Sequence, residues 1–327
     1  MAASDFVETS GVHYRYRALG LTLMAEFPCP GFWPASPDDA SRAVAITFGP
    51  VPEALDRPLI RRPLTEIGAG NRCLHRVPGI ARYLVDGHSR IVIDPHPETA
   101  LERILTFLRG TPLAFACHLW NLIPLNTACI AVDGRAVLLG SGPAYGKSTM
   151  TAALAQRGHT LMADAMCALD TTDPAAPLIW PSFPDVSLWP DSLAALDMEP
   201  PPTAAPGPGG RFRIDATPWF DPAPKPPSGL AVIRKAFGAT TPSRSASSLG
   251  RLQKFETVAN LVCLLDIART LPGNPSRLDA IARLSSLLTI TEFRFPPNLD
   301  HVPAQADLLA AAARQGGEQA CPPRSAT

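Results

Sequence analysis

The chain has 327 residues, long enough for one large domain or two modest ones, and 46% of them are hydrophobic, too many for a disordered protein. It contains 29 lysines and arginines and 29 aspartates and glutamates, so its formal net charge is zero. A protein that holds nucleic acid by neutralising phosphates needs a basic excess or a basic face, so this composition argues against that class.

The first hundred residues are expected to form mainly short β-strands. The strands are predicted at Leu19–Phe27, Ala43–Phe48, Arg82–Val85 and Arg90–Asp94. The last two flank the turn dipeptide Asp86-Gly87, which predicts a β-hairpin. Pro97–Gly110 follows with apolar residues at helical spacing and predicts a helix. We therefore expect an N-terminal, β-rich domain over residues 1–110.

The stretch Thr111–Val132 carries no formal charge, but it does not favour a membrane span. It includes two prolines and several polar residues, which are costly in hydrocarbon. A buried helix that runs into a buried strand explains it better. The N-terminal segment lacks the apolar core of a secretory signal. The 7 cysteines are scattered and never spaced as CxxC, which favours a reducing compartment over a disulfide framework or zinc site. We expect a cytoplasmic protein.

The pattern from residue 126 onward is that of a nucleotide-binding unit. The predicted elements are strands at Ala128–Val132 and Arg135–Leu139 joined by Asp133-Gly134, a helix from Ser148 to Gln156 ended by Gly158, and a strand at Thr160–Ala163 and Met166–Leu169 interrupted by Asp164. The loop GSGPAYGKST lies between the second strand and the helix. Strand, glycine-bearing loop, helix and strand follow one another in the order of a phosphate-binding unit.

The GKST sequence in this loop carries the chemistry. Backbone N–H groups of the loop and of the helix N-terminus point toward phosphate oxygens. Lys147 supplies a positive charge for the β- and γ-phosphates, and the Ser148 hydroxyl can bind magnesium. Gly146 lets the backbone approach closely, because it has no Cβ. We expect the nucleotide to be contacted by Gly142, Pro143, Ala144, Tyr145, Gly146, Lys147, Ser148 and Thr149.

The loop departs from the pattern GxxxxGK[ST] at its start. Ser141 stands where the first glycine is expected, although Gly140 and Gly142 flank it. Tyr145 is either a surface aromatic residue or a side chain that leans over the nucleotide, and the sequence favours neither.

Two further features lie outside the loop. Asp164, at the end of a predicted strand, can bind magnesium or accept a proton from an attacking hydroxyl, although a capping aspartate is the alternative. The stretch Pro200–Pro227 contains ten prolines, which predicts a loop or flap. Within it, Arg211 and Arg213 either reach the transferred phosphoryl group or are solvated.

The C-terminal third is expected to complete an α/β domain over residues 111–302. A strand is predicted at Gly229–Arg234, helices at Thr257–Leu271 and Arg277–Leu288, and a helical, frayed tail over residues 303–327.

The segment LNTACIAVDGRAVLLGSGPAYGKSTMTAALAQRGHTLMADAMCALD resembles the catalytic core of the HPr kinase/phosphorylase family. The chain is more similar still to the HPr-kinase-like serine kinases of lasso-peptide biosynthetic clusters, through YRALGLTLMAEFPCP, FGPVPEAL and PSFPDVSLWPDSLAAL. The likeness covers residues 14–300. It implies an α/β fold with a phosphoenolpyruvate-carboxykinase/HPr-kinase-like P-loop core and an N-terminal mainly β domain.

The resemblance also implies an activity and the residues for it. The activity is ATP- and magnesium-dependent phosphorylation of a serine hydroxyl on a ribosomally made, lasso-type precursor peptide. Lys147 and Ser148 match the phosphate and magnesium ligands, and Asp164 matches the first of two adjacent aspartates, the base and metal contact. Ala165 replaces the second aspartate, and Asn126 replaces a histidine beside the phosphates. Asn126 can hydrogen-bond a phosphate oxygen but cannot carry a positive charge.

Two alternatives to the peptide kinase follow. The chain could phosphorylate a carrier protein of the HPr type, or it could be a pseudokinase that binds a nucleotide and a peptide without transfer. Asn126, Ser141 and Ala165 favour the pseudokinase. In each case we expect a peptide or small protein as partner, no nucleic acid or membrane, and a possible homo-oligomer.

Overall fold

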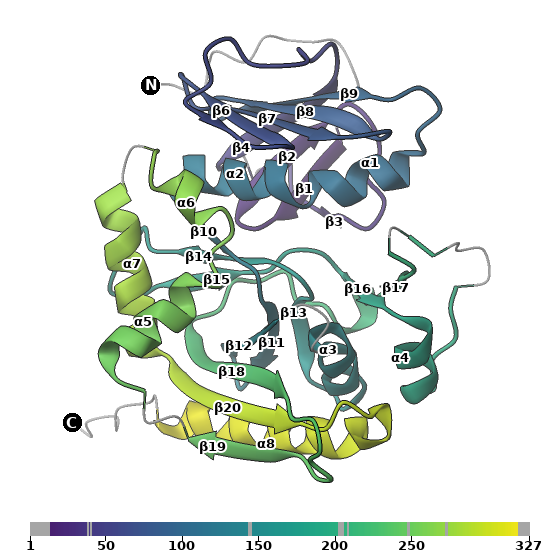
Figure 1. Ribbon diagram of the computed structural model, residues 1–327, viewed down its shortest axis with the longest axis vertical. Helices are drawn as coiled ribbons and strands as arrows, with labels where there is room; N and C mark the ends of the chain where they lie inside the picture. The colour runs from purple at the N-terminus through teal and green to yellow at the C-terminus, as the bar shows by residue number, and fades with distance from the viewer. Residues whose placement is uncertain are drawn as a thin grey trace.

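The computed structural model describes residues 14–37, 39, 41–142, 146–201, 206–207, 209–246, 249–271 and 274–319. Its N-terminal strands form one mixed sheet in the order β3-β1-β2-β4-β9-β8-β7-β6-β5 (Figure 1). These strands are β1 Tyr14–Ala18, β2 Leu21–Ala25, β3 Trp33–Pro34, β4 Ala43–Phe48, β5 Ile60–Arg61, β6 Thr65–Gly68, β7 Arg72–Val77, β8 Ala81–Asp86 and β9 Arg90–Pro95. The predicted hairpin at Asp86-Gly87 is confirmed, since β8 and β9 pair antiparallel.

The predicted strand Leu19–Phe27 is wrong at both ends, since β2 covers only Leu21–Ala25. Leu19 and Gly20 form the turn between β1 and β2, with φ angles of 59° and 76°. Two consecutive positive φ angles match the right-handed twist of a tight hairpin, so these residues reverse the chain before β2 begins. The Leu19 N–H donates to the Pro181 carbonyl, 2.7 Å away, which ties this turn to a distant part of the chain.

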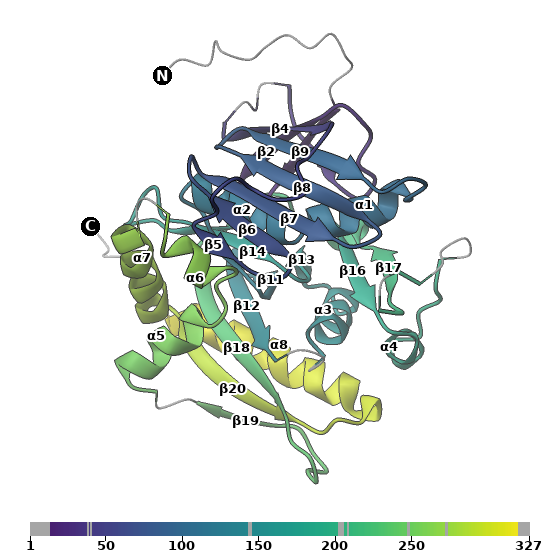
Figure 2. The ribbon, with the colours of Figure 1, turned by 45° about the horizontal axis from the view of Figure 1, so that its top comes forward.

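Two helices, α1 Leu101–Leu108 and α2 Thr111–Leu119, lie between this sheet and the rest of the molecule (Figures 1 and 2). Their apolar side chains share one core with the sheet and with residues far along the chain, such as Phe183 and Ile267. The predicted helix over Pro97–Gly110 is confirmed as α1, although it begins four residues later. No helix among the described residues is long and apolar enough to span a bilayer.

A second sheet carries the predicted nucleotide-binding unit. Its order is β13-β11-β12-β18-β20-β19. The strands are β11 Ala128–Val132, β12 Arg135–Ser141, β13 Thr160–Ala163, β18 Pro227–Lys235, β19 Ser243–Ala246 and β20 Thr289–Phe295. The helices α3 Lys147–Gln156 and α8 Val302–Gln319 pack on one face, and α5 Arg251–Ala259 and α7 Asn274–Leu287 on the other. The expected α/β architecture is confirmed, as is the buried helix-to-strand interpretation of residues 111–132.

Smaller elements connect the two sheets. They are β10 Ile123–Leu125, β14 Cys167–Asp170 and β15 Leu178–Trp180 in a three-stranded sheet, the pair β16 Asp185–Leu188 and β17 Phe212–Asp215, the helices α4 Pro190–Ala195 and α6 Leu265–Ala268, and the short 3₁₀ helices η1 Thr217–Trp219 and η2 Leu299–His301. The domain boundaries expected after residues 110 and 302 stay predictions.

Three predicted elements are wrong in detail. The strand expected over residues 160–169 is two strands, β13 and β14, which belong to different sheets. The helix expected over Thr257–Leu271 ends as α5 at Ala259 and restarts as α6, because Leu264 adopts a left-handed conformation with φ 55°. The proline-rich stretch is not a loop throughout, because β17 pairs along β16 and β18 begins at Pro227.

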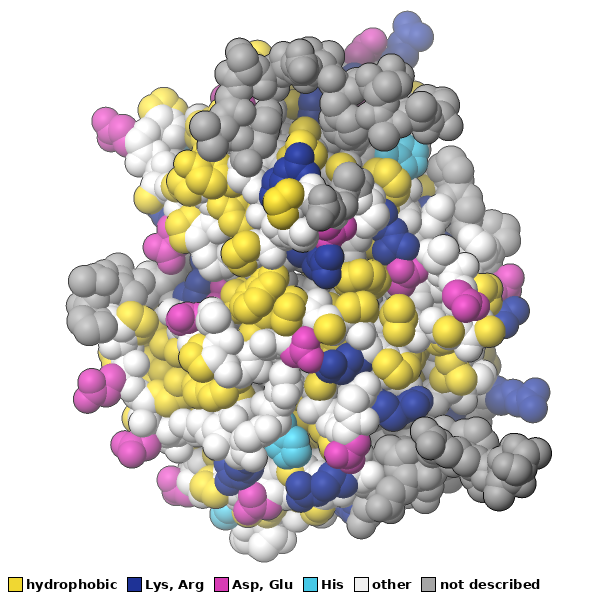
Figure 3. Space-filling view, turned by 180° about the vertical axis from the view of Figure 1, so that it is seen from behind, with side chains coloured by type: hydrophobic (Ala, Val, Ile, Leu, Met, Phe, Trp, Pro, Cys, Tyr) yellow, Lys and Arg dark blue, Asp and Glu magenta, His cyan; other side chains and the backbone are white. Residues whose placement is uncertain are grey.

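Figure 3 shows the face opposite to that of Figure 1. Basic and acidic side chains are interspersed there among apolar ones, in keeping with the zero net charge of the chain.

The β1–β2 turn predicts a stability difference between two glycine substitutions. A Cβ on Gly20 would lie 2.9 Å from the Trp180 ring, whose indole N–H is held by Asp170. Gly87 also has a positive φ, but a Cβ there meets nothing within 4 Å. Gly87→Ala should cost only the left-handed strain, about 1–2 kcal/mol, whereas Gly20→Ala should cost at least about 1 kcal/mol more. Denaturant unfolding measures both, and equal losses would contradict the close packing at Gly20.

Candidate functional site

A cleft of about 580 Å³ opens at one edge of the six-stranded sheet. Most of its lining comes from three segments, namely the N-terminal turn of α3, the β16–α4 connection with Arg211, and the β20–α8 connection. Its lining includes Asn126, Ser141, Gly142, Gly146, Lys147, Ser148, Thr149, Met150, Asp164, Ala165, Ser187, Trp189, Asp191, Ser192, Arg211, Lys235, Phe295, Pro296, Pro297, Asn298, Leu299, Val302 and Gln305. Seven of the ten predicted site residues therefore meet in one cleft: Asn126, Gly142, Gly146, Lys147, Ser148, Thr149 and Asp164.

The start of α3 has a backbone geometry that suits an anion. Gly146 has a φ of 86°, in the region that favours glycine, and a Cβ there would meet no atom within 4 Å. The helix begins at Lys147, so its first N–H groups face the cleft edge. Free N–H groups and the helix dipole together favour an anion at this position.

The Lys147 ammonium group is partly buried in this edge of the cleft. Burial lowers its pKa, the Asp164 carboxylate raises it, and the Arg211 guanidinium lowers it again. Two cations and one carboxylate are therefore close enough to influence one another, and the excess positive charge suits an anionic ligand.

Asp164 follows β13 and is buried. Its Oδ2 accepts a hydrogen bond from the Ser187 N–H at 3.0 Å, whereas its Oδ1 is buried with no hydrogen-bond partner among the described residues. Burial raises the pKa of Asp164 to about 6, although the Ser187 N–H, the nearby Ser148 hydroxyl and Lys147 favour the charged form. A carboxylate with a free oxygen and a pKa close to neutrality can accept a proton or bind a cation.

The remaining predicted residues differ in what they offer. The Thr149 side chain is buried and its hydroxyl donates to Ser192 at 3.0 Å, so only its backbone faces a ligand. Asn126 and Ala165 are exposed and line the cleft. Ser141 stands where the first glycine of the loop was expected, and its hydroxyl donates to the Gly142 carbonyl at 2.9 Å. Pro143, Ala144 and Tyr145 lie outside the described residues.

Several cleft residues had no role in the sequence analysis. Trp189 and Asp191 come from the β16–α4 connection, and Lys235 ends β18. The Arg211 guanidinium stacks over the Trp189 ring at 5.0 Å, which keeps it in the cleft. The segment PSFPDVSLWPDSLAAL was the only signal for this wall, and it carried no assignment to single residues.

Arg213 does not line the cleft, so of the two roles left open for it the structure does not favour contact with a phosphoryl group. Its Nη2 donates to the Thr106 hydroxyl at 2.7 Å, and its Nε lies 3.8 Å from the Asp185 carboxylate. Arg211 lies before β17 begins at Phe212, so strand alternation does not fix its direction. Its guanidinium lies over Trp189 in the cleft, while Arg213 binds the α1 side.

Asp185 connects the cleft to the N-terminal sheet through Arg109. The Arg109 guanidinium pairs with Asp185 and donates to the carbonyls of Pro30 and Gly31. It also lies between the rings of Phe32 and Phe183, 4.6 and 4.3 Å from their centroids. Such a buried, aromatic-enclosed ion pair has few alternative arrangements. It therefore holds β16 in place, two residues before the Ser187 N–H that binds Asp164.

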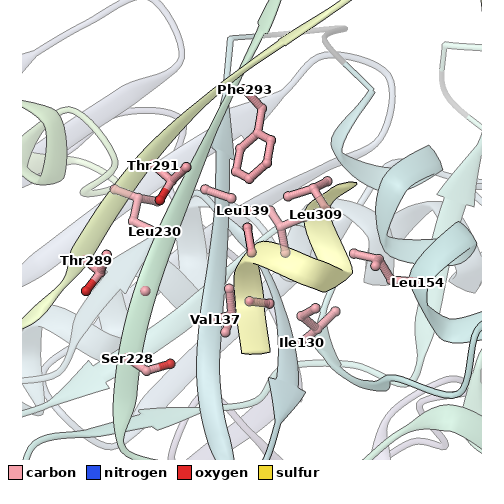
Figure 4. Close-up of a pocket in the computed structure, with 14 residues that line it drawn as sticks. Ile130, Val137, Leu139, Leu154, Ser228, Leu230, Thr289, Thr291, Phe293 and Leu309 are labelled. Atoms are coloured by element: carbon pink, nitrogen blue, oxygen red, sulfur yellow. The ribbon is translucent and has the colours of Figure 1, made fainter. Parts of the chain in front are cut away.

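Other hollows in the described part of the chain offer less chemistry. A cavity of about 30 Å³ lies between the six-stranded sheet and α8 (Figure 4), where mostly apolar side chains such as Val137, Leu139 and Phe293 line it with three hydroxyl groups but no titratable group. A hollow of about 710 Å³ beside β7 and β8 contains Arg82 and Asp94, but these two pair with each other at 2.6 Å.

The cleft residues fit a magnesium nucleotide better than a protein-bound metal. No group of three or more histidine, cysteine, aspartate or glutamate side chains among the described residues could hold a metal ion. Magnesium bound with a nucleotide takes one or two protein ligands and completes its shell with phosphate oxygens and water. The unpartnered Asp164 oxygen and the Ser148 hydroxyl meet that smaller requirement.

Comparison with protein-family models gives no match for the chain, and no curated protein matches it. Among solved structures, the chain is similar to the Hpr(Ser) kinase/phosphatase from Coxiella burnetii, with 12% sequence identity and a TM-score of 0.33 over 60% of this chain and 98% of that one. A TM-score this low does not establish a common fold, so membership of that family stays an expectation from the sequence.

The raised pKa of Asp164 predicts a pH-dependent stability. An aspartate titrates near 3.9 in the unfolded chain and at about 6 here, so the folded state binds the proton more tightly. Its contribution to stability is present below pH 4 and is lost as pH rises through 6. In magnesium-free buffer, Asp164→Asn should therefore stabilise the protein by up to about 3 kcal/mol above pH 7 and have little effect below pH 4. Denaturant unfolding across this range measures it, and a destabilised variant at pH 8 would contradict the burial.

Proposed function

We propose that the protein is an ATP- and magnesium-dependent kinase that phosphorylates a serine hydroxyl of a ribosomally made, lasso-type precursor peptide. The observation that carries the kinase proposal is Asp164: a buried carboxylate with one free oxygen, beside Lys147 and Ser148 at a helix N-terminus. The peptide as substrate, and its lasso type, are supported by the resemblance of the sequence to the kinases of such clusters.

Each cleft residue has its own role in transfer of the γ-phosphoryl group. The N–H groups of the α3 N-terminus and Lys147 hold the β- and γ-phosphates, and Asn126 donates to a phosphate oxygen. Asp164 Oδ1 takes the proton of the serine hydroxyl while the serine oxygen bonds to the γ-phosphorus. The bond from that phosphorus to the β–γ bridging oxygen breaks, and ADP leaves. Magnesium, when held by Ser148, would neutralise charge that develops on the phosphates.

Asp164 acts through a single oxygen in this arrangement. Its Oδ2 is held by the Ser187 N–H, so Oδ1 serves as proton acceptor or as metal contact, not fully as both. A pKa of about 6 suits a proton acceptor near neutral pH. Of the two roles expected for Asp164, this geometry favours the base.

A second candidate is the nucleotide-binding pseudokinase. The observation in its favour is Ala165, which is exposed in the cleft where the resemblance implies a second carboxylate. Asn126 likewise offers no positive charge. Asp191 brings another carboxylate to the cleft, but its Oδ1 already accepts from the Ser192 N–H at 2.7 Å. Binding without transfer is the outcome that separates the two candidates.

The phosphate loop predicts the effect of removing one charge. Lys147→Ala leaves the β- and γ-phosphates uncompensated, and a charge-assisted contact contributes about 1.5–3 kcal/mol. ATP affinity should therefore fall about ten- to a hundredfold in titration calorimetry. Lys254→Ala, on α5 and outside the cleft lining, is the control and should bind as the parent does. Unchanged affinity in a folded Lys147→Ala protein would refute the phosphate loop.

Transfer itself is tested at Asp164 and Ala165. Asp164→Asn should abolish phosphorylation of a candidate peptide, since a positioned base contributes about 10²–10⁴ in rate. Ala165→Asp should increase transfer, because the new carboxylate would face the cleft. Mass spectrometry of the peptide, after incubation with ATP and magnesium, detects the gain of a phosphoryl group.

Each outcome of this comparison selects a candidate. Activity that survives Asp164→Asn removes the catalytic role of that residue. No transfer by the parent or by either variant, with ATP still bound, assigns the pseudokinase.

A further inference from the structure

The order of the strands in the six-stranded sheet fixes which cleft residues lie on either side of the phosphate-loop strand β12. β12, β18 and β20 run parallel, and β13 runs the same way because both β12 and β13 pair antiparallel with β11. The carboxyl ends of these four strands therefore meet at one edge, where ligands of open α/β sheets bind. In the order β13-β11-β12-β18-β20, the phosphate-loop strand β12 is two strands from β13 and two from β20.

This order sets the direction of a bound triphosphate. Neighbouring strands are about 4.8 Å apart, so Asp164 after β13 and Phe295 at the end of β20 lie about 10 Å to either side of β12. The transferred phosphoryl group must lie next to the proton acceptor, Asp164. The remainder of the nucleotide then extends from the loop in the opposite direction, past Lys235 at the end of β18.

The wall on the Asp164 side is better suited to the serine hydroxyl that receives the phosphoryl group. Ser187 binds Asp164 directly, and Trp189 follows two residues later. The exposed Trp189 ring would stack a base, but one of its faces carries the Arg211 guanidinium. A base at Trp189 would also occupy the space that a hydroxyl needs to reach Asp164.

The wall on the β20 side has the composition of a nucleoside subsite. Phe295, Pro296, Pro297, Leu299 and Val302 line it with carbon. Pockets for such groups are mostly apolar, with a few fixed polar atoms.

Gln305 supplies the polar atom. It is buried, and its Nε2 donates to the Pro296 carbonyl at 3.1 Å. No described residue donates to its Oε1, which leaves an acceptor for an amino group of a base.

We propose that the β20–α8 wall, chiefly Leu299 and Gln305, binds the nucleoside end of the triphosphate. This proposal rests on the proposed kinase function, since it assumes a triphosphate on the loop at α3. The bound nucleoside packs on Leu299 and the neighbouring prolines, and an exocyclic amino group of its base donates to Gln305 Oε1. Lys235 lies between this wall and the loop.

Binding of ATP and of inorganic tripolyphosphate, each with magnesium, tests the wall, because only ATP carries a nucleoside. Calorimetry should show ATP bound more tightly than tripolyphosphate by the parent. Leu299→Ala and Gln305→Ala should each weaken ATP about three- to tenfold and leave tripolyphosphate unchanged. Lys147→Ala should weaken both ligands.

Leu308→Ala is the matched control, since Leu299 and Leu308 are both partly buried against the same core but only Leu299 lines the cleft. It should change neither affinity. The proposal is overturned if the two wall variants leave ATP binding intact, or weaken tripolyphosphate equally. Selective loss of ATP in Trp189→Ala would place the nucleoside on the other wall and overturn it too.

The same measurements separate this proposal from the proposed function. Equal affinities of the parent for ATP and tripolyphosphate would overturn the nucleoside subsite while the phosphate loop stands. A parent protein that binds neither ligand would overturn the kinase function, and the subsite with it.

Discussion

The ion pair between Arg109 and Asp185 joins the two halves of this protein at the point where the cleft is built. Arg109 ends α1 under the N-terminal sheet, and Asp185 begins β16 beside the cleft. Because the guanidinium is enclosed by two aromatic rings and bound to two carbonyls, it cannot follow a displaced carboxylate without breaking several contacts. The position of β16, and of the Ser187 N–H that holds Asp164, therefore depends on the N-terminal sheet.

Burial of Asp164 at this site lowers the stability of the folded chain. A carboxylate that is buried with one oxygen unpartnered opposes folding above its pKa of about 6. The same burial makes it a better proton acceptor near neutral pH than an exposed aspartate. Lys147 beside it limits this cost. Stability is thus exchanged for reactivity at one residue, a pattern typical of functional sites.

Some of the fold could be predicted from the sequence because its signals are local. The hairpin at Asp133-Gly134, the helix after the GKST loop and its end at Gly158, whose φ is 85°, all depend on neighbouring residues, and the structure places them as expected. Strand β20 was not predicted, although its sequence TITEFRF is rich in β-branched and aromatic residues, which favour a strand, and the structure pairs it with β18. The separation of β13 from β14 depends likewise on two different sheets.

The residues of the candidate site likewise fall into those predicted from the sequence and those placed only by the tertiary structure. The sequence by itself predicted a phosphate loop with Lys147 and Ser148, and it placed Asp164 as a carboxylate at a strand end, because these signals are local. Only the tertiary structure decided that Arg211 reaches the cleft while Arg213 binds Asp185, and that the β20–α8 connection faces the loop. These positions follow from strand order and from contacts between residues far apart in the chain. Burial, which makes Asp164 reactive, is a property of the assembled core, not of any segment within it.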